Sequence, residues 1–230
     1  MKAMILAAGR GERMGTLTDQ CPKPLLKVNG KALIEFSIEK LVAADFKDIV
    51  INIAYLGKHI QEYCGNGTKW GASIVYSDEG RNALETAGGI KNALPLLGGK
   101  PFLVVNADVF CDFPLNTLRN KAFDLAHLIL INNPPHHPQG DFGLQDNGLL
   151  TEQETDKLTF SGIGVYHPTL FDHIPSGPMK LRPVLAEGIS NRQISGEKYT
   201  GLWVDIGTPQ RLAEINAHLR AESRILACWK

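Results

Sequence analysis

Apolar positions follow two alternating patterns along the first half of the chain. Short continuous apolar runs are typical of buried strands, and apolar residues recurring every three to four positions are typical of helices. The runs cover residues 2–7, 48–54, 72–77 and 101–107, and the helical segments cover residues 32–44, 56–64 and 87–97. This alternation of strand and helix predicts an α/β fold, with a mostly parallel sheet covered by helices on both faces.

The second half of the chain has shorter segments. Three short strand-like segments predict a small antiparallel region, at residues 142–144, 149–151 and 158–166. A helix over 179–191 and a strand over 201–206 follow. Thr208 and Pro209 then supply an N-cap and a first-turn proline for a terminal helix that runs to about residue 228. We find no linker or repeat and expect one domain, residues 1–230.

Composition narrows the class of protein. The 230 residues carry 24 Lys+Arg and 24 Asp+Glu, and this zero net charge argues against a protein that coats nucleic acid. No apolar run approaches the roughly 20 residues of a membrane span, and the short N-terminal run does not have the form of a signal peptide. The four cysteines lack zinc-site spacing, so we expect reduced thiols in a soluble cytoplasmic protein.

A glycine-rich loop follows the first predicted strand. Ligands of open α/β sheets bind beyond the carboxyl ends of the strands, where this loop lies. Gly9 and Gly11 allow the backbone to approach a phosphate closely and to turn its N–H groups toward it. Arg13 supplies a guanidinium, and Lys23 supplies an ammonium on a backbone stiffened by a proline at each side. The pattern predicts a phosphate-binding loop, with a purely structural glycine turn as the alternative.

Two other phosphate-loop classes do not fit this sequence. A dinucleotide-binding loop has the pattern G-x-G-x-x-G, but Met14 stands at its last glycine. The P-loop pattern G-x-x-x-x-G-K-[ST] is absent as well. A nicotinamide oxidoreductase is therefore a weak hypothesis.

Five motifs together resemble the sugar-phosphate nucleotidyltransferases. They are LAAGRGERM with PKPLL at 6–14 and 22–26, LETAGGI at 84–90, VNADV at 105–109, SGIGVY at 161–166 and WVDIGTP at 203–209. The motifs span nearly the whole chain in the order found in that family. The resemblance implies a Rossmann-like sheet of the nucleotide-diphospho-sugar transferase type, with a small antiparallel region on the sugar side.

The resemblance also implies a reaction. An oxygen of a sugar 1-phosphate attacks the α-phosphorus of a nucleoside triphosphate, and pyrophosphate leaves. It implies Arg13, Lys23 and Asp108 as catalytic residues, and Mg²⁺ held by Asp108 and Asp205. Both carboxylates end predicted strands, where a turn or cap role is the alternative.

The nucleotide and sugar contacts also follow from the resemblance. The nucleotide set is Ala8, Gly9, Gly11, Glu12, Arg13, Lys23, Glu79, Gly80, Thr86, Gly88 and Asn106. The sugar set is Asn106, Asp141, Gly143, Glu154, Gly162 and Asp205.

The chain departs from the family at three places. Glu85 replaces a usual glycine, and it is expected either to contact ribose or to face solvent. Ser161 stands where relatives often carry Asn. The Glu-Lys-Pro motif that clamps the sugar is missing, and the nearby Glu152, Glu154 and Lys157 leave its replacement open. These departures predict a sugar other than a plain hexose.

Two segments, NNPPHHPQGDF at 132–142 and LETAGGI at 84–90, resemble those of one subfamily, the N-acetylmuramate 1-phosphate uridylyltransferases of peptidoglycan recycling. The short length of the chain is also similar to that subfamily. This resemblance implies UTP and the sugar 1-phosphate as small-molecule substrates, and we expect no binding to nucleic acid or to a membrane. The sequence does not fix the oligomeric state. The sugar's lactyl carboxylate needs a cation or amide donors. The candidate residues, each with a plain surface role as its alternative, are His136, His137, Lys157, Lys180 and Arg182. Alternatives are a mannose 1-phosphate guanylyltransferase, a glucose 1-phosphate uridylyl- or thymidylyltransferase, and a non-enzymatic nucleotide-sensing regulator.

Overall fold

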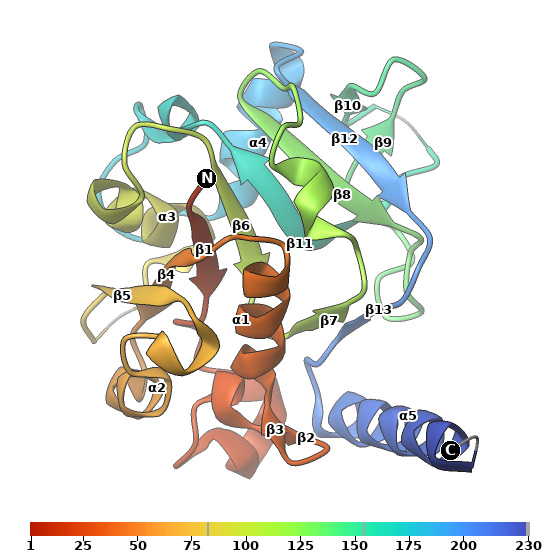
Figure 1. Ribbon diagram of the computed structural model, residues 1–230. Coiled ribbons are helices and arrows are strands. Elements are labelled where there is room, and N and C mark those ends of the chain that lie inside the picture. Colours follow the sequence, from red (N-terminus) through yellow and green to blue (C-terminus); the bar gives the residue numbers. More distant parts are fainter. Residues whose placement is uncertain (82, 154, 229–230) are drawn as a thin grey trace.

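A seven-stranded sheet forms the centre of the computed structural model, which describes residues 1–81, 83–153 and 155–228, with residues 220–228 as backbone only. Its order is β12-β8-β11-β6-β1-β4-β5 (Figure 1). The strands are β1 (Ala3–Leu6), β4 (Asp48–Ile53), β5 (Ser73–Asp78), β6 (Phe102–Asn106), β8 (Ala126–Ile131), β11 (Thr159–Tyr166) and β12 (Ile194–Tyr199). Only β11 runs antiparallel to its two neighbours, which confirms the mostly parallel α/β sheet.

Helices cover both faces of this sheet. Successive strand residues point to opposite faces, and in β1 the side chains of Ala3 and Ile5 join one core cluster while Met4 joins another. The first cluster includes residues of α1 (Leu33–Ala43) and α2 (Gly57–Cys64). The second includes residues of α3 (Glu85–Leu97) and α4 (Leu181–Ser190). Burial on both faces explains why the parallel strands are continuous apolar runs.

Three two-stranded sheets flank the centre. They are β2 (Lys27–Val28) with β3 (Lys31–Ala32), β7 (Val109–Cys111) with β13 (Trp203–Asp205), and β9 (Gly143–Leu144) with β10 (Leu150–Thr151). All three are antiparallel, so the expected antiparallel region is present.

The C-terminal helix α5 (Pro209–Cys228) lies beyond the sheet, beside β2 and β3 (Figure 1). Thr208 caps it as expected, because its side chain accepts a hydrogen bond from the Arg211 N–H at 3.3 Å. Ile215 of α5 and Met14 pack in a third core cluster. The glycine-rich loop is therefore anchored by the C-terminal helix. Within the described residues, no helix has both the length and the apolar character needed to cross a membrane.

Two details differ from the sequence-based expectation. Strands β8 and β12 were not predicted, yet they form one side of the sheet. Residues 158–166 were assigned to the small antiparallel region, but β11 lies inside the main sheet between β6 and β8. Strand pairing over such long separations depends on tertiary packing, which a local hydrophobic pattern does not encode.

Candidate active site

A cleft of about 670 Å³ opens at the carboxyl ends of β1, β4 and β6. Parallel strands end at the same edge of a sheet, so segments far apart in the sequence meet here. Its walls include ten of the predicted residues: Ala8, Gly9, Gly11, Glu12, Arg13, Lys23, Glu79, Thr86, Asn106 and Asp108. The structure therefore gathers most of the predicted nucleotide and catalytic set around one space.

The two loop glycines have different environments. Gly11 has a positive φ of 72°, and a Cβ there would lie 3.1 Å from the Lys23 Cβ. A side chain at this position would thus strain the backbone and press on Lys23. A Cβ on Gly9 would meet no atom within 4 Å, so its surface is open to a ligand. Arg10, which was not predicted, also lines the cleft, and its guanidinium lies 5.3 Å from the Tyr55 ring centre.

Lys23 and Asp108 form an ion pair across the cleft. Lys23 is almost buried, with 8% of its surface exposed, and lies in the short 3₁₀ turn Lys23–Leu25. The Pro22 carbonyl accepts the Leu25 N–H at 2.8 Å, which closes this turn. Asp108 follows β6 directly. The turn thus holds Lys23 at the cleft wall, while its pairing with Asp108 was not foreseen.

A buried amide that the sequence reasoning missed organises the opposite wall. Asn52, 3% exposed, accepts the Ala7 N–H at 2.7 Å and donates to Glu79 Oε1 at 2.6 Å. The other Glu79 oxygen accepts the Leu84 N–H at 2.7 Å. Burial raises the pKa of the Glu79 carboxyl, while these two hydrogen bonds act in the opposite direction. Asparagine inside an otherwise apolar strand was the signal that could have revealed this network.

Asp205 lies beside Asp108 through the pairing of β7 with β13. The Ile206 N–H donates to the Asp108 carbonyl at 2.8 Å, so the two backbones are adjacent. The Asp205 carboxylate pairs with Arg211 of α5 and lies 3.1 Å from His136 Nε2. Neither contact of Asp205 was predicted: His136 was a candidate for the lactyl carboxylate, and Arg211, one helical turn after the Thr208 cap, was not named.

Gly207 leaves space for the ion pair between Asp205 and Arg211. A Cβ at Gly207 would lie 2.5 Å from Arg211 Nη2 and 3.1 Å from Asp205 Oδ2. Gly207 itself lines the cleft, whereas Asp205, predicted for both metal and sugar, lines neither the cleft nor the smaller cavity beside it. No group of three or more metal-ligating side chains occurs in the described part of the chain. Two carboxylates are nevertheless a common protein contribution to Mg²⁺, because substrate phosphates and water complete its six ligands.

A second cavity of about 250 Å³ adjoins the cleft. Leu6, Glu85, Thr86 and Asn106 line both spaces and mark the junction between them. The remaining wall is formed by Val104, Phe160, Gly162, Tyr166, Lys180, Leu181 and Arg182. We call this space the junction cavity.

Two residues that line the junction cavity have a positive φ. Gly162 (φ 82°) is needed because a Cβ there would lie 2.5 Å from Asn106 Nδ2. Glu85 has a φ of 60°, a conformation that glycine adopts at little cost and glutamate does not. This explains the usual glycine of the family, and the strained Glu85 side chain is exposed at the junction.

Other predicted residues lie away from these walls. Gly88, predicted to contact the nucleotide, lines neither space, and a Cβ there would lie 2.2 Å from the Gly177 carbonyl oxygen. Both carboxylate oxygens of Asp141 contact other residues of the chain: Oδ1 lies 3.1 Å from His137 Nε2, and Oδ2 accepts the Phe160 N–H at 2.8 Å. Gly80 and Gly143 do not line either space, and Glu154 lies outside the described residues.

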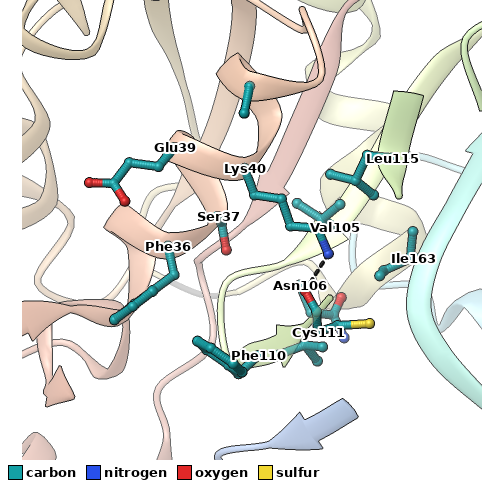
Figure 2. Close-up of a pocket in the computed structure, with 12 residues that line it drawn as sticks. Phe36, Ser37, Glu39, Lys40, Val105, Asn106, Phe110, Cys111, Leu115 and Ile163 are labelled. Atoms are coloured by element: carbon teal, nitrogen blue, oxygen red, sulfur yellow. Dashed lines mark hydrogen bonds between the residues drawn. The ribbon is translucent and has the colours of Figure 1, made fainter. Parts of the chain in front are cut away.

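An apolar cavity of about 350 Å³ lies between α1 and β7 (Figure 2). Its walls are mainly hydrophobic, and its ammonium group, Lys40, donates a hydrogen bond to the Cys111 carbonyl. Burial lowers the pKa of Lys40. Since this amine is engaged and partly desolvated, the apolar cavity is unsuited to a triphosphate, in contrast to the cleft.

Comparisons with known proteins agree with this geometry. The chain is 51% identical over 225 residues to the N-acetylmuramate alpha-1-phosphate uridylyltransferase of Neisseria meningitidis serogroup B, covering 94% of this chain and 97% of that protein. It is 33% identical over 238 residues to the protein of the same name from Caulobacter vibrioides, covering 97% and 96%. The crystal structure of HddC from Yersinia pseudotuberculosis shares the fold, with a TM-score of 0.79, 17% identity and coverage of 95% and 99%. Residues 2–222 match the sequence profile described as Nucleotidyl transferase, and the chain belongs to that family.

Proposed function

We propose that this protein transfers the uridylyl group of UTP to N-acetylmuramate α-1-phosphate. A phosphate oxygen of the sugar attacks the α-phosphorus of UTP, the bond from that phosphorus to the bridging oxygen breaks, and pyrophosphate leaves. The products are UDP-N-acetylmuramate and pyrophosphate. The observation that carries the proposal is 51% identity to an enzyme of that name over nearly both chains.

The residues at the cleft fit a magnesium ion. Asp108 lines the cleft, and Asp205 comes from the adjacent backbone, two positions before Gly207 of the cleft wall. Each carboxylate pairs with a cation of the chain, Lys23 and Arg211 respectively. Oxygen ligands of this kind suit Mg²⁺. When bound, Mg²⁺ would supply positive charge that offsets the repulsion between the two phosphates. In this proposal, Asp108 and Asp205 hold the ion.

Lys23 and the glycine-rich loop stabilise charge on the triphosphate. The Lys23 ammonium is held by its turn at the cleft wall, and we assign it to the α-phosphate or the incoming sugar phosphate. Arg13 is exposed on the same wall and is assigned to the phosphates that leave as pyrophosphate. The open surface over Gly9 admits the triphosphate close to the backbone. Catalysis then rests on positioning and charge rather than on a covalent intermediate.

The sugar lies in the junction cavity and the uridine in the main cleft. Asn106 lines both spaces and is available to a hydroxyl of either substrate part. Glu79 is held by Asn52 and Leu84 at the wall assigned to the base. UTP is made in the cytoplasm, so we assign the reaction to that compartment, and we assign it to peptidoglycan recycling because muramate is a cell-wall sugar.

A substrate panel tests this proposal. Purified protein is incubated with Mg²⁺ and each of UTP, dTTP, GTP and ATP, combined with the 1-phosphates of N-acetylmuramate, glucose and mannose, and pyrophosphate release is measured. We expect UTP with N-acetylmuramate 1-phosphate to give the highest kcat/KM. Preference for GTP with mannose 1-phosphate, or for UTP or dTTP with glucose 1-phosphate, would reject the muramate assignment. Binding of UTP without turnover of any sugar would favour a regulator.

A further inference from the structure

We propose that Lys180 is the specificity residue that recognises the lactyl carboxylate of the sugar. This inference rests on the proposed function, because it takes the sugar to be N-acetylmuramate. The lactyl ether adds one carboxylate to a sugar that is otherwise N-acetylglucosamine. A cation beside the sugar's ring would give a protein preference for the muramate sugar, because a charge-assisted hydrogen bond to a carboxylate is stronger than a neutral one.

Four of the five cationic side chains named above are unsuited to this role. His136 lies between Asp205 and Arg211, and His137 contacts Asp141. Lys157 does not line the cleft or the junction cavity.

The fourth is Arg182, which lines the junction cavity but already faces two carboxylates. Its guanidinium lies 3.7 Å from Asp141 and 3.3 Å from Glu152, and it stacks over the Phe142 ring. A second anion would have to compete with these acids for Arg182.

Lys180 differs from all four. It lines the junction cavity, it is exposed, and within the described residues its ammonium has neither a hydrogen bond nor an ion pair. An uncompensated ammonium at a cavity wall can pair with a ligand carboxylate without breaking an existing contact. Of the five candidates, Lys180 is thus the one that lines the junction cavity and has no partner among the described residues.

The position of Lys180 within the cavity also fits the shape of the substrate. The phosphate end of the sugar must lie at the junction, near Asp108 and the cleft. Lys180 lines the junction cavity but not the cleft, so it lies on the side away from the phosphate. The lactyl group is on the third ring carbon and the phosphate on the first, which places the carboxylate toward this side of the cavity.

The backbone that carries Lys180 is firmly held. The Met179 carbonyl accepts the N–H groups of Ala87 and Gly88 at 2.9 and 3.1 Å, and the Met179 N–H donates to the Leu84 carbonyl at 2.9 Å. These bonds join the residue before Lys180 to the start of α3, beside the junction. Such anchoring gives a long, flexible lysine a fixed origin next to the substrate.

The test compares two ligands that differ only in the lactyl group. Calorimetry gives the Kd of UDP-N-acetylmuramate and of UDP-N-acetylglucosamine for the wild type, Lys180→Met, Lys180→Arg and the exposed-lysine control Lys58→Met. We expect Lys180→Met to reduce the preference for the muramate ligand by about 10- to 100-fold, as for loss of one charge-assisted contact. Lys180→Arg should recover most of that preference, and Lys58→Met should retain it.

Equal weakening of both ligands, or an unchanged preference, would overturn the role of Lys180. Thermal melting of each variant identifies one that fails to fold, and if Lys180→Met is that variant, the equally uncharged Lys180→Gln supplies the comparison. Failure of the proposed function is distinguishable, because the wild-type protein itself would then fail to make UDP-N-acetylmuramate from UTP and the sugar 1-phosphate. If the wild type does make UDP-N-acetylmuramate and Lys180→Met keeps the wild-type preference, only the role of Lys180 is overturned.

Discussion

At the scale of single residues, the ion pair between Lys23 and Asp108 is the centre of the proposed chemistry. Replacing Lys23 with Ala removes a preorganised charge from the cleft wall. We expect kcat to fall by about 10²–10³, the usual effect of losing one contact that stabilises transition-state charge. The rate of pyrophosphate release at saturating UTP and N-acetylmuramate 1-phosphate measures kcat.

A nearby lysine provides the control for this variant. Lys27 lies four positions further on, is exposed, and does not line the cleft. Lys27→Ala should keep kcat within about twofold, as exposed positions usually do. If Lys23→Ala also kept kcat within about fivefold, the assigned role of Lys23 would be wrong.

Asn52 carries a prediction about stability. Replacement by Leu leaves the buried Ala7 N–H and the Glu79 carboxylate without this partner. Each buried polar group left unpaired costs about 1–3 kcal/mol. We therefore expect the free energy of unfolding, measured with urea, to fall by about 2–4 kcal/mol. Asn116→Leu, at an exposed position, is the control and should change stability by less than about 0.5 kcal/mol. Equal effects of the two variants would contradict the network.

The residue scale also shows what a sequence can and cannot predict. The loop glycines, Arg13 and Lys23 could be predicted because their types and spacing have a direct phosphate-binding reason. The polar Asn52 stands out in its apolar strand, but its partners could not be predicted, since they are 45 and 27 positions away and meet it only in the folded chain. The close packing of Gly88 against Gly177 had no signal in the sequence, because glycine serves both ligand approach and close packing.

At the scale of elements, the start of α3 is held by the segment that leads into α4. A Cβ on Gly88 would overlap the Gly177 carbonyl. We expect Gly88→Ala to destabilise the protein by about 1–3 kcal/mol through overpacking, and to raise the KM for the sugar 1-phosphate by displacing the Lys180 segment. Urea unfolding and steady-state kinetics measure the two effects.

Gly99→Ala is the matched control, because a Cβ there meets nothing within 4 Å. It should leave both stability and KM near the wild-type values. Similar behaviour of the two alanine variants would show that the contact between Gly88 and Gly177 does not hold the two elements together.

The order of elements was easier to predict than their pairing. Continuous apolar runs and helical spacing predicted β1, β4, β5, β6 and the helices between them, because burial on both faces leaves a strong local pattern. The edge strand β12 (ISGEKY) is polar enough to resemble a loop. The antiparallel position of β11 between β6 and β8 is a property of the assembled sheet and has no local signal.

At the scale of the whole molecule, a buried histidine couples stability to pH. Burial lowers the pKa of His127 to about 4, and its Nε2 lies 3.6 Å from Glu197, beyond hydrogen-bond distance. The unfolded chain has the ordinary histidine pKa of about 6.5. As the pH falls from about 6.5 to about 4, the unfolded state therefore binds the proton first, and the folded state loses stability.

We expect His127→Gln to flatten this dependence. The free energy of unfolding should then fall less between pH 7 and pH 5 than in the wild type, by about 1–2 kcal/mol. Urea unfolding at the two pH values measures the difference. His173→Gln, at an exposed histidine, should keep the wild-type dependence. Parallel pH profiles for wild type and His127→Gln would contradict the assignment.

The most direct measurement of the central claim is a crystal structure with UTP and Mn²⁺, in which anomalous scattering locates the metal. The account predicts a peak bonded to the carboxylates of Asp108 and Asp205, with the triphosphate along residues 8–13 and near Lys23. A metal bound elsewhere, or a triphosphate that avoids the glycine-rich loop, would contradict it.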